Sequence, residues 1–170
     1  MYEVIDNFLP ENVHLQIKES LIGTSSKFPW YYNQSKSGED LSFSNSIKYN
    51  FQFTHRFYAD FIPLSNYFNL ILPFLELLNP TALIRVKANL TPCTDNLITY
   101  HYHVDIPPAS NTKTAIYYVN TNNGRTVFKD CTYINSIENR LVMFDSRFYH
   151  AGTSCTDEKV RCVINFNYTK

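Results

Sequence analysis

The stretch Tyr100-His101-Tyr102-His103-Val104-Asp105 decides how the rest of this 170-residue chain is interpreted, together with the distant histidine His150. In a β-strand, residues i and i+2 point to the same face, so His103 and Asp105 can reach one metal ion from neighbouring positions. His150 must then come from a strand that the fold brings alongside. Two imidazoles and one carboxylate with open coordination positions are typical of non-haem Fe(II) sites that activate oxygen. The sequence therefore predicts a metal site made by His103, Asp105 and His150.

The remaining histidines are weaker candidates for this site. His101 shares the predicted face of His103, so the spacing alone leaves either residue as the ligand, while the i, i+2 pairing with Asp105 favours His103. Without the distal histidine, this pair could equally belong to a solvated strand face. We expect His14 and His55 at the surface.

The second half of the chain has the period-two alternation of strands with two different faces. In the last segment, Arg161 and Asn165 share one face, which fits the lining of a pocket better than a sealed core, and the opposite apolar face should pack against helices. A turn is predicted at 121–124 because Asn-Gly favours hairpins. Strands are expected over residues 82–89, 97–104, 113–120, 125–129, 141–144 and 160–168.

The first half of the chain is expected to be mixed. A strand over residues 2–5 precedes a helix that begins at Pro10, runs through Val13, Ile17 and Leu21, and stops at Gly23. Further elements are expected as a strand over 28–32, an extended segment or short helix over 51–58, and a helix over 64–78 that Pro73 kinks or splits.

The segment from Asn33 to Asn50 is rich in Ser, Asn and Lys, and we interpret it as a mobile loop. Loops of this length are often lids or binding loops, and plain surface disorder is the equal alternative. The loop at 106–111 follows the predicted ligands directly. We expect the two loops to flank the pocket entrance, with Trp30, Tyr31 and Tyr32 at the hinge.

Many short strands separated by turns predict a mainly β fold with flanking helices, a double-sheet jelly roll. The length fits a single domain over residues 1–170. Within it, residues 1–80 should form an N-terminal strand and helix support with the lid loop, and residues 81–170 the jelly-roll core. The N-terminal helices should pack outside the larger sheet.

The composition excludes several function classes. A formal net charge of zero argues against a broad nucleic-acid-binding surface, and only four glycines leave no phosphate-cradling loop. No apolar run is long enough for a transmembrane helix, and the first residues lack the layout of a signal peptide. The four cysteines, scattered without a Cys-x-x-Cys pair, indicate a reduced, cytoplasmic setting. The abundance of Asn, Lys, Ile and Tyr is typical of an AT-rich genome, microbial or viral.

With these residues in place, the chain resembles the Fe(II)/2-oxoglutarate-dependent dioxygenases, most closely their prolyl-hydroxylase-like branch. The resemblance rests on His103-Val104-Asp105, on the segments 115–120 and 141–145, on His150, and on Arg161 in the last strand. It covers roughly the second half of the chain. It implies the double-stranded β-helix, a cupin-like jelly roll, and it favours His103 over His101 as the ligand.

The resemblance also implies the co-substrate site. Arg161 would grip the distal carboxylate of 2-oxoglutarate, because a guanidinium matches a carboxylate in a bidentate way. Tyr118 holds the place of a tyrosine that shares this contact in the family, and Asn165 and Asn89 are further co-substrate candidates. Asn89 lies on the strand where family members often use a polar or aromatic residue to contact the co-substrate, and this chain lacks the tyrosine found there in several hydroxylases. The implied cofactors are Fe(II), 2-oxoglutarate and O2, with ascorbate left open.

The substrate is not chosen by the sequence. The leading interpretation is hydroxylation of a protein side chain, prolyl among them, or of a free amino acid, with succinate and CO2 as co-products. His101, Trp30 and Tyr32 are the candidate substrate residues. Alternatives are an oxidative demethylase or hydroxylase of nucleic-acid bases, which a basic groove around the pocket would favour, and a jelly-roll binding module without turnover. No membrane partner is expected, and the oligomeric state is open.

Overall fold

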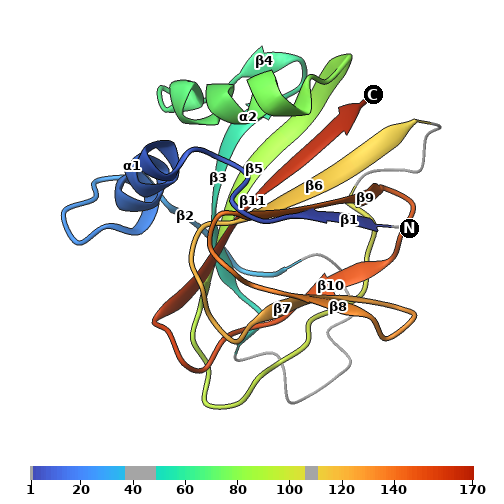
Figure 1. Cartoon of the computed structure of the whole chain (residues 1–170). Coiled ribbons are helices and arrows are strands. Elements are labelled where there is room, and N and C mark those ends of the chain that lie inside the picture. Colours follow the sequence, from blue (N-terminus) through green and yellow to red (C-terminus); the bar gives the residue numbers. More distant parts are fainter. Residues whose placement is uncertain (1, 37–48, 106–110) are drawn as a thin grey trace.

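Two antiparallel sheets face each other in this protein (Figure 1). Residues of both sheets line a cavity. The computed structural model describes residues 2–36, 49–105 and 111–170. The eight-stranded sheet has the order β1 (Tyr2–Ile5), β9 (Arg140–Asp145), β6 (Thr112–Tyr118), β11 (Val160–Thr169), β5 (Ala82–Pro92), β3 (Gln52–Ala59) and β2 (Tyr31–Asn33), with β4 (Ile62–Pro63) beside β3. The three-stranded sheet has the order β10 (His150–Gly152), β7 (Arg125–Phe128) and β8 (Tyr133–Asn135).

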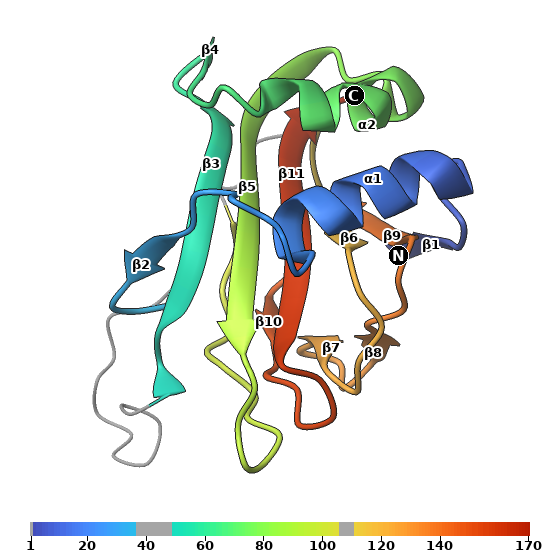
Figure 2. The same ribbon diagram turned by 90° about the vertical axis from the view of Figure 1, so that its left-hand side faces the viewer.

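The helices cover only the outer face of the large sheet (Figure 2). Helix α1 spans Glu11–Ile22, and a short 3-10 helix, Phe68–Ile71, leads into α2, Leu72–Leu78. Pro73 lies in the first turn of α2, where its missing N–H removes no helical hydrogen bond. The helical segment therefore begins later than expected, and it is split next to Pro73 into the 3-10 helix and α2. No helix among the described residues is both long and apolar enough to span a bilayer.

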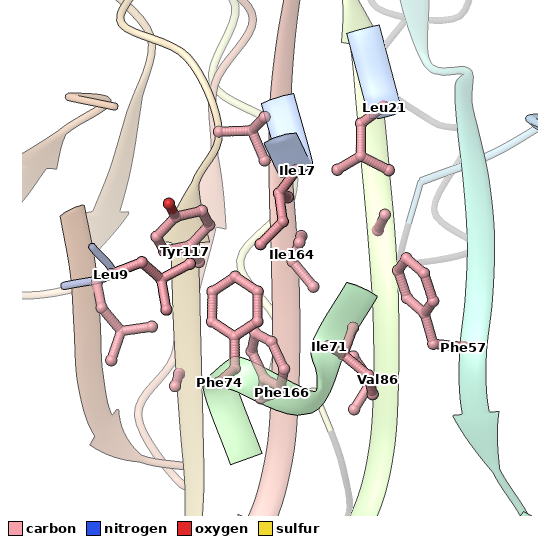
Figure 3. Packing of buried hydrophobic residues seen from close by; sticks show 14 of the residues in the cluster. Leu9, Ile17, Leu21, Phe57, Ile71, Phe74, Val86, Tyr117, Ile164 and Phe166 are labelled. Atoms are coloured by element: carbon pink, nitrogen blue, oxygen red, sulfur yellow. The ribbon is translucent and has the colours of Figure 1, made fainter. Parts of the chain in front are cut away.

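The main core fills the space between these helices and the large sheet (Figure 3). Phe74 of α2 packs on Tyr117 and Phe166, with ring centroids 4.7 and 4.9 Å apart. The outer-face residues of β11 belong to this core, as their alternation predicted: Cys162, Ile164, Phe166 and Tyr168. Truncating a buried phenylalanine such as Phe166 to alanine costs about 3–5 kcal/mol in cores of this kind. The mainly β, two-sheet architecture with helices on the larger sheet is confirmed.

The expectation that His14 and His55 lie at the surface is wrong. His14 is 1% exposed and its Nδ1 lies 2.7 Å from the Tyr117 hydroxyl, while His55 is 4% exposed. The two ring nitrogens of His55 bond to the Pro29 carbonyl and the Ser65 hydroxyl. A buried histidine is tolerated where both nitrogens find partners, and the sequence gives no sign of those partners.

Three other expectations need correction. Residues 97–104 form no continuous strand, and only Thr99 and His103 make isolated bridges. The turn at 121–124 is not a hairpin, because β6 and β7 belong to different sheets and the turn connects them. The first half of the chain also contributes β1, β2 and β3 to the large sheet, so that sheet crosses the expected boundary at residue 80. Most of the two predicted lid loops, residues 37–48 and 106–110, lies outside the described residues.

Candidate metal and co-substrate site

Two histidines far apart in the sequence meet at β10, an edge strand of the small sheet. His103 and His150 form an isolated antiparallel bridge, and their ring centroids are 4.8 Å apart. Asp105 follows within reach, so that one possible ligand atom from each of the three residues lies within 4.8 Å of the others. The structure thus brings together the three residues that the spacing singled out, although Asp105 lies in a bend and not in a strand.

The backbone orients both imidazoles. The Nδ1 atom of His103 lies 3.0 Å from the His101 carbonyl oxygen, and that of His150 lies 3.1 Å from the Phe148 carbonyl oxygen. A carbonyl only accepts, so each Nδ1 carries the proton and each Nε2 presents its lone pair. Both Nε2 atoms face Asp105, at 3.6 and 3.8 Å from its carboxylate oxygens. His101 thus contributes its backbone carbonyl and not its ring.

Asp105 is a buried carboxylate with its side chain 5% exposed. Burial alone would raise its pKa, but the neighbouring His103 and His150 and the charge of Arg85 outweigh burial and hold the pKa below its usual range. Arg85 Nη2 is 3.3 Å from Oδ1, and the Asn167 amide donates to Oδ2 at 3.3 Å. Asp105 is therefore an anion in the folded protein.

This donor set fits a divalent transition metal. It offers two neutral imidazole nitrogens and one ionised carboxylate, all in the protonation state that metal binding requires. The outer hydrogen bonds from the imidazoles to backbone carbonyls are those that commonly orient metal-ligating histidines. Two imidazoles and one carboxylate leave further coordination positions for small molecules, which is the arrangement of non-haem Fe(II) sites.

Arg161 lies in the same cavity as the three residues and is 5% exposed. Its Nε donates to the Ser136 hydroxyl at 2.9 Å, and Nη2 donates to the Thr126 hydroxyl at 3.3 Å. Burial lowers its pKa, yet a guanidinium stays charged in proteins. No carboxylate of the described residues lies within ion-pair distance of Arg161. A buried cation held only by hydroxyls is arranged to receive an anion.

Tyr118 lies on the same side of β6 as Ile116, which lines the cavity, but Tyr118 itself does not line it. It is fully buried in a second apolar cluster, and its hydroxyl donates to Thr126 Oγ1 at 2.8 Å. The Arg161 guanidinium carbon lies 5.6 Å from the ring centroid. Tyr118 therefore orients Thr126, which in turn holds Arg161, and its direct contact with the co-substrate stays a prediction.

Lys36 and Tyr100 line the Arg161 end of the cavity, and neither was singled out from the sequence. Lys36 Nζ lies 3.2 Å from the centroid of the Tyr100 ring, is buried, and has no hydrogen-bond partner in the part of the chain that the structure describes. Burial, and then the charge of Arg161, lower the pKa of Lys36 to about 6. Burial also raises the pKa of Tyr100 to about 12. Lys36 gave no signal in the sequence because it follows a short strand far from the motif.

Asn89 and Asn165 lie on the cavity face of the large sheet, as their alternation predicted. The register of β5 and β11 pairs Asn89 with Val163 and Lys87 with Asn165. The Oδ1 atoms of both asparagines are buried and have no hydrogen-bond partner among the described residues, so these two oxygens can each bind a ligand. Their role towards 2-oxoglutarate stays a prediction.

The three candidate substrate residues lie off the cavity lining. Trp30 packs against the helix-covered core and its indole N–H donates to the Leu21 carbonyl at 3.1 Å. Tyr32 is 64% exposed and pairs with Phe53, on the face of β3 opposite to the cavity-lining Gln52. His101 is half-buried beside the metal triad without lining the cavity.

Arg85 and Lys87 line the cavity and were not chosen from the sequence, although the alternation in β5 already placed them on the face of Asn89. The sequence therefore already indicated these two residues, because two basic side chains on a strand face that points into a protein are unusual. The cavity itself has a volume of about 150 Å³. Its walls come from both sheets.

No family model and no curated protein matches this chain by sequence. Solved structures match nearly all of it. The viral collagen prolyl hydroxylase of Paramecium bursaria Chlorella virus-1, in its 2-oxoglutarate complex, is 16% identical, with a TM-score of 0.59 and coverage of 99% of this chain and 96% of that one. A Trichoplax adhaerens prolyl hydroxylase, bound to a hypoxia-inducible-factor peptide, is 14% identical, with a TM-score of 0.61 and coverage of 99% and 83%.

A third matching structure is not a hydroxylase by its description. It is a non-haem α-ketoglutarate-dependent carbocyclase from nogalamycin biosynthesis, 13% identical, with a TM-score of 0.65 and coverage of 99% of this chain and 79% of that one. At such identities the likeness is one of fold. The chain has the double-stranded β-helix fold of the Fe(II)- and 2-oxoglutarate-dependent oxygenases, which include the prolyl hydroxylases.

Proposed function

We propose that this chain is an Fe(II)- and 2-oxoglutarate-dependent dioxygenase that hydroxylates a protein side chain, prolyl among the candidates, or a free amino acid. Succinate and CO2 are the co-products. One observation carries the proposal. A single cavity holds His103, Asp105 and His150 with their ligand atoms turned towards one another, together with Arg161, a buried cation without an acidic partner.

His103, Asp105 and His150 are the residues that would hold the iron. When bound, Fe(II) and 2-oxoglutarate supply the oxidative chemistry, in which O2 is consumed, 2-oxoglutarate loses CO2, and a C–H bond of the substrate is hydroxylated. The protein holds both imidazoles as Nδ1–H tautomers and keeps Asp105 ionised. These contacts set the ligands before any metal arrives.

Arg161 would bind the distal carboxylate of 2-oxoglutarate through its fork. Ser136 and Thr126 fix the guanidinium from behind, and Lys36 adds a second cation at the same end of the cavity. Asn89 and Asn165 would contact the middle of the co-substrate.

Aromatic and aliphatic side chains keep water from His150. The Phe144 ring lies edge-on to the His150 ring at 4.9 Å, Phe128 lies at 6.4 Å, and Ile116 and Val163 line the cavity nearby. An apolar wall strengthens the electrostatic contacts inside and limits side reactions.

Structural neighbours support a peptide or small-molecule substrate, since one was solved with a peptide and another is a carbocyclase. The four cysteines are all free thiols, which supports a cytoplasmic setting. The arrangement of the triad and of Arg161 disfavours a binding module without turnover, because such a module has no need of either.

Succinate formation tests the proposal. Purified protein with Fe(II), 2-oxoglutarate, O2 and ascorbate should release succinate slowly without substrate, and His150→Ala should abolish the release. The variant His101→Ala keeps the triad and the backbone carbonyl that holds His103, and it serves as the control. Equal succinate from the parent and from His150→Ala would rule out the proposed centre.

A further inference from the structure

The cavity carries more positive charge than its proposed cofactors can balance. Among the described residues, four basic ones line it, Lys36, Arg85, Lys87 and Arg161, and Asp105 is the one acidic residue in this part of the lining. A bound Fe(II) and a bound 2-oxoglutarate dianion cancel each other's charge, so they leave this excess unchanged. Uncompensated buried cations are costly, which favours an additional anion in the cavity.

The basic residues form two groups. Arg161 pairs with Thr91 across β11 and β5, whereas Lys87 pairs with Asn165 and Arg85 with Asn167. At about 3.3 Å per residue, the backbone positions of the two groups are about 13–20 Å apart along the sheet. 2-Oxoglutarate is only about 6 Å long. A molecule that binds Arg161 at one end therefore leaves the second group to another ligand.

The second group lies beside the metal triad. Arg85 contacts Asp105 at 3.3 Å and donates from Nε to the side-chain oxygen Oδ1 of Asn167 at 3.0 Å. Lys87 makes no ion pair with a described residue and is half-buried. Arg56, exposed on β3, pairs with Lys87 across the strands and extends the positive surface towards solvent.

We propose that the substrate of this cavity is an anion whose carboxylate or phosphate group docks on Arg85 and Lys87. The proposal rests on the proposed oxygenase function and adds the substrate class. The docked group lies next to Asp105, so it places a neighbouring C–H bond of the substrate near the metal position. A free amino acid or another small acid satisfies this chemistry through its carboxylate, and a phosphorylated small molecule satisfies it through its phosphate.

The test uses fluorinated probes and 19F NMR. The protein is first saturated with Zn(II), a redox-inert stand-in for iron, and with N-oxalylglycine, an unreactive 2-oxoglutarate analogue that occupies the Arg161 end. Trifluoroacetate, its neutral counterpart trifluoroacetamide, and difluoromethylphosphonate are then titrated separately. An anionic probe should bind at least about tenfold more tightly than trifluoroacetamide, as a charge-assisted contact implies. The stronger of the two anions tells whether the site prefers a carboxylate or a phosphate.

Lys87→Gln should remove this preference, and Lys87→Arg should restore most of it. Lys113→Gln changes a lysine of the same sheet outside the cavity lining and should leave the preference unchanged. Equal affinities for charged and neutral probes, equal losses in Lys87→Gln and Lys113→Gln, or displacement of the anion by more N-oxalylglycine would each overturn the inference. Failure of Zn(II) and N-oxalylglycine to bind at all would instead refute the proposed function.

Discussion

His103 and His150 are joined by a two-way backbone hydrogen bond. The N–H of His103 donates to the His150 carbonyl at 2.9 Å, and the N–H of His150 donates to the His103 carbonyl at 3.0 Å. The two imidazoles are therefore placed by the backbone itself. Asp105, the third residue of the triad, is positioned separately by Arg85 and Asn167.

Replacing Asp105 with alanine should weaken Zn(II) binding by about 100-fold or more, because changes even to outer partners of metal ligands cost about 10–100-fold. Isothermal titration calorimetry measures the affinity. Asp145→Ala is the matched control, since Asp145 also pairs with an arginine, Arg147, but lies outside the cavity. Equal affinities in the two variants would exclude Asp105 as a ligand.

Two glycines beside Arg161 should respond differently to alanine. A Cβ on Gly124 would lie 2.6 Å from Arg161 Cδ and 2.7 Å from the Ser154 carbonyl oxygen, whereas a Cβ on Gly152 would meet Arg161 Nη1 at an ordinary 3.5 Å. Gly124→Ala should therefore displace the guanidinium and reduce 2-oxoglutarate affinity about tenfold or more, with a loss of stability of about 1–3 kcal/mol. Gly152→Ala should change both little. Calorimetry measures the 2-oxoglutarate affinity and thermal unfolding measures the stability. Equal losses in Gly124→Ala and Gly152→Ala would show that the Cβ contacts do not position Arg161.

Lys36 should take up a proton when 2-oxoglutarate binds. Its pKa of about 6 leaves the amine largely neutral at pH 7.5 in the empty cavity, because burial and Arg161 disfavour its charge. An arriving carboxylate favours the charged form, so its pKa rises and about one proton is taken up. The binding enthalpy should then depend on the ionisation enthalpy of the buffer. In Lys36→Met this dependence should vanish, and a buffer-independent enthalpy in the parent protein would refute the link.

His55 should make the protein less stable in mild acid. Burial lowers its folded pKa below the ordinary value of 6.5, so the unfolded chain binds its proton first as the pH falls. The contribution of His55 is fully present above about pH 6.5 and is lost as the pH falls through the folded pKa. In His55→Gln, the free energy of unfolding should be lower at pH 8 by about 1–3 kcal/mol and should depend less on pH below 6.5.

Urea unfolding between pH 5 and pH 8 measures this difference. The dependence of the unfolding free energy on pH should become weaker in His55→Gln without vanishing, because His14 remains and burial lowers the pKa of His14 as well. An identical slope in parent and variant would show that His55 is not neutral in the folded state.

The sequence predicted those parts of the fold that depend on local periodicity. The alternation in β11 correctly separated Phe166, in the helix-covered core, from Arg161, in the cavity. The sequence predicted that His103 and His150 lie close together, because two ligands of one metal ion must do so. The course of the chain that brings them together was not predicted, because the segment around His103 is not a regular strand and makes only isolated bridges.

Contacts between distant segments of the chain were also not predictable from the sequence. The burial of His14 depends on Tyr117 in another strand, and Lys36 meets Tyr100 only in three dimensions. Tyr118 was assigned to the co-substrate by its place in the sequence, while its hydroxyl in fact bonds to Thr126. Such partners are decided by sheet register and side-chain packing, which local pattern does not specify.

The most direct test of the central claim is optical absorption of the anaerobic protein with Fe(II) and 2-oxoglutarate. Chelation of Fe(II) by the keto acid gives a visible charge-transfer band. The account predicts this band in the parent protein, its loss in Asp105→Ala, and a much higher 2-oxoglutarate requirement in Arg161→Lys, which keeps the charge but lacks the fork. Absence of the band from the parent protein, or an unchanged band in both variants, would contradict the account.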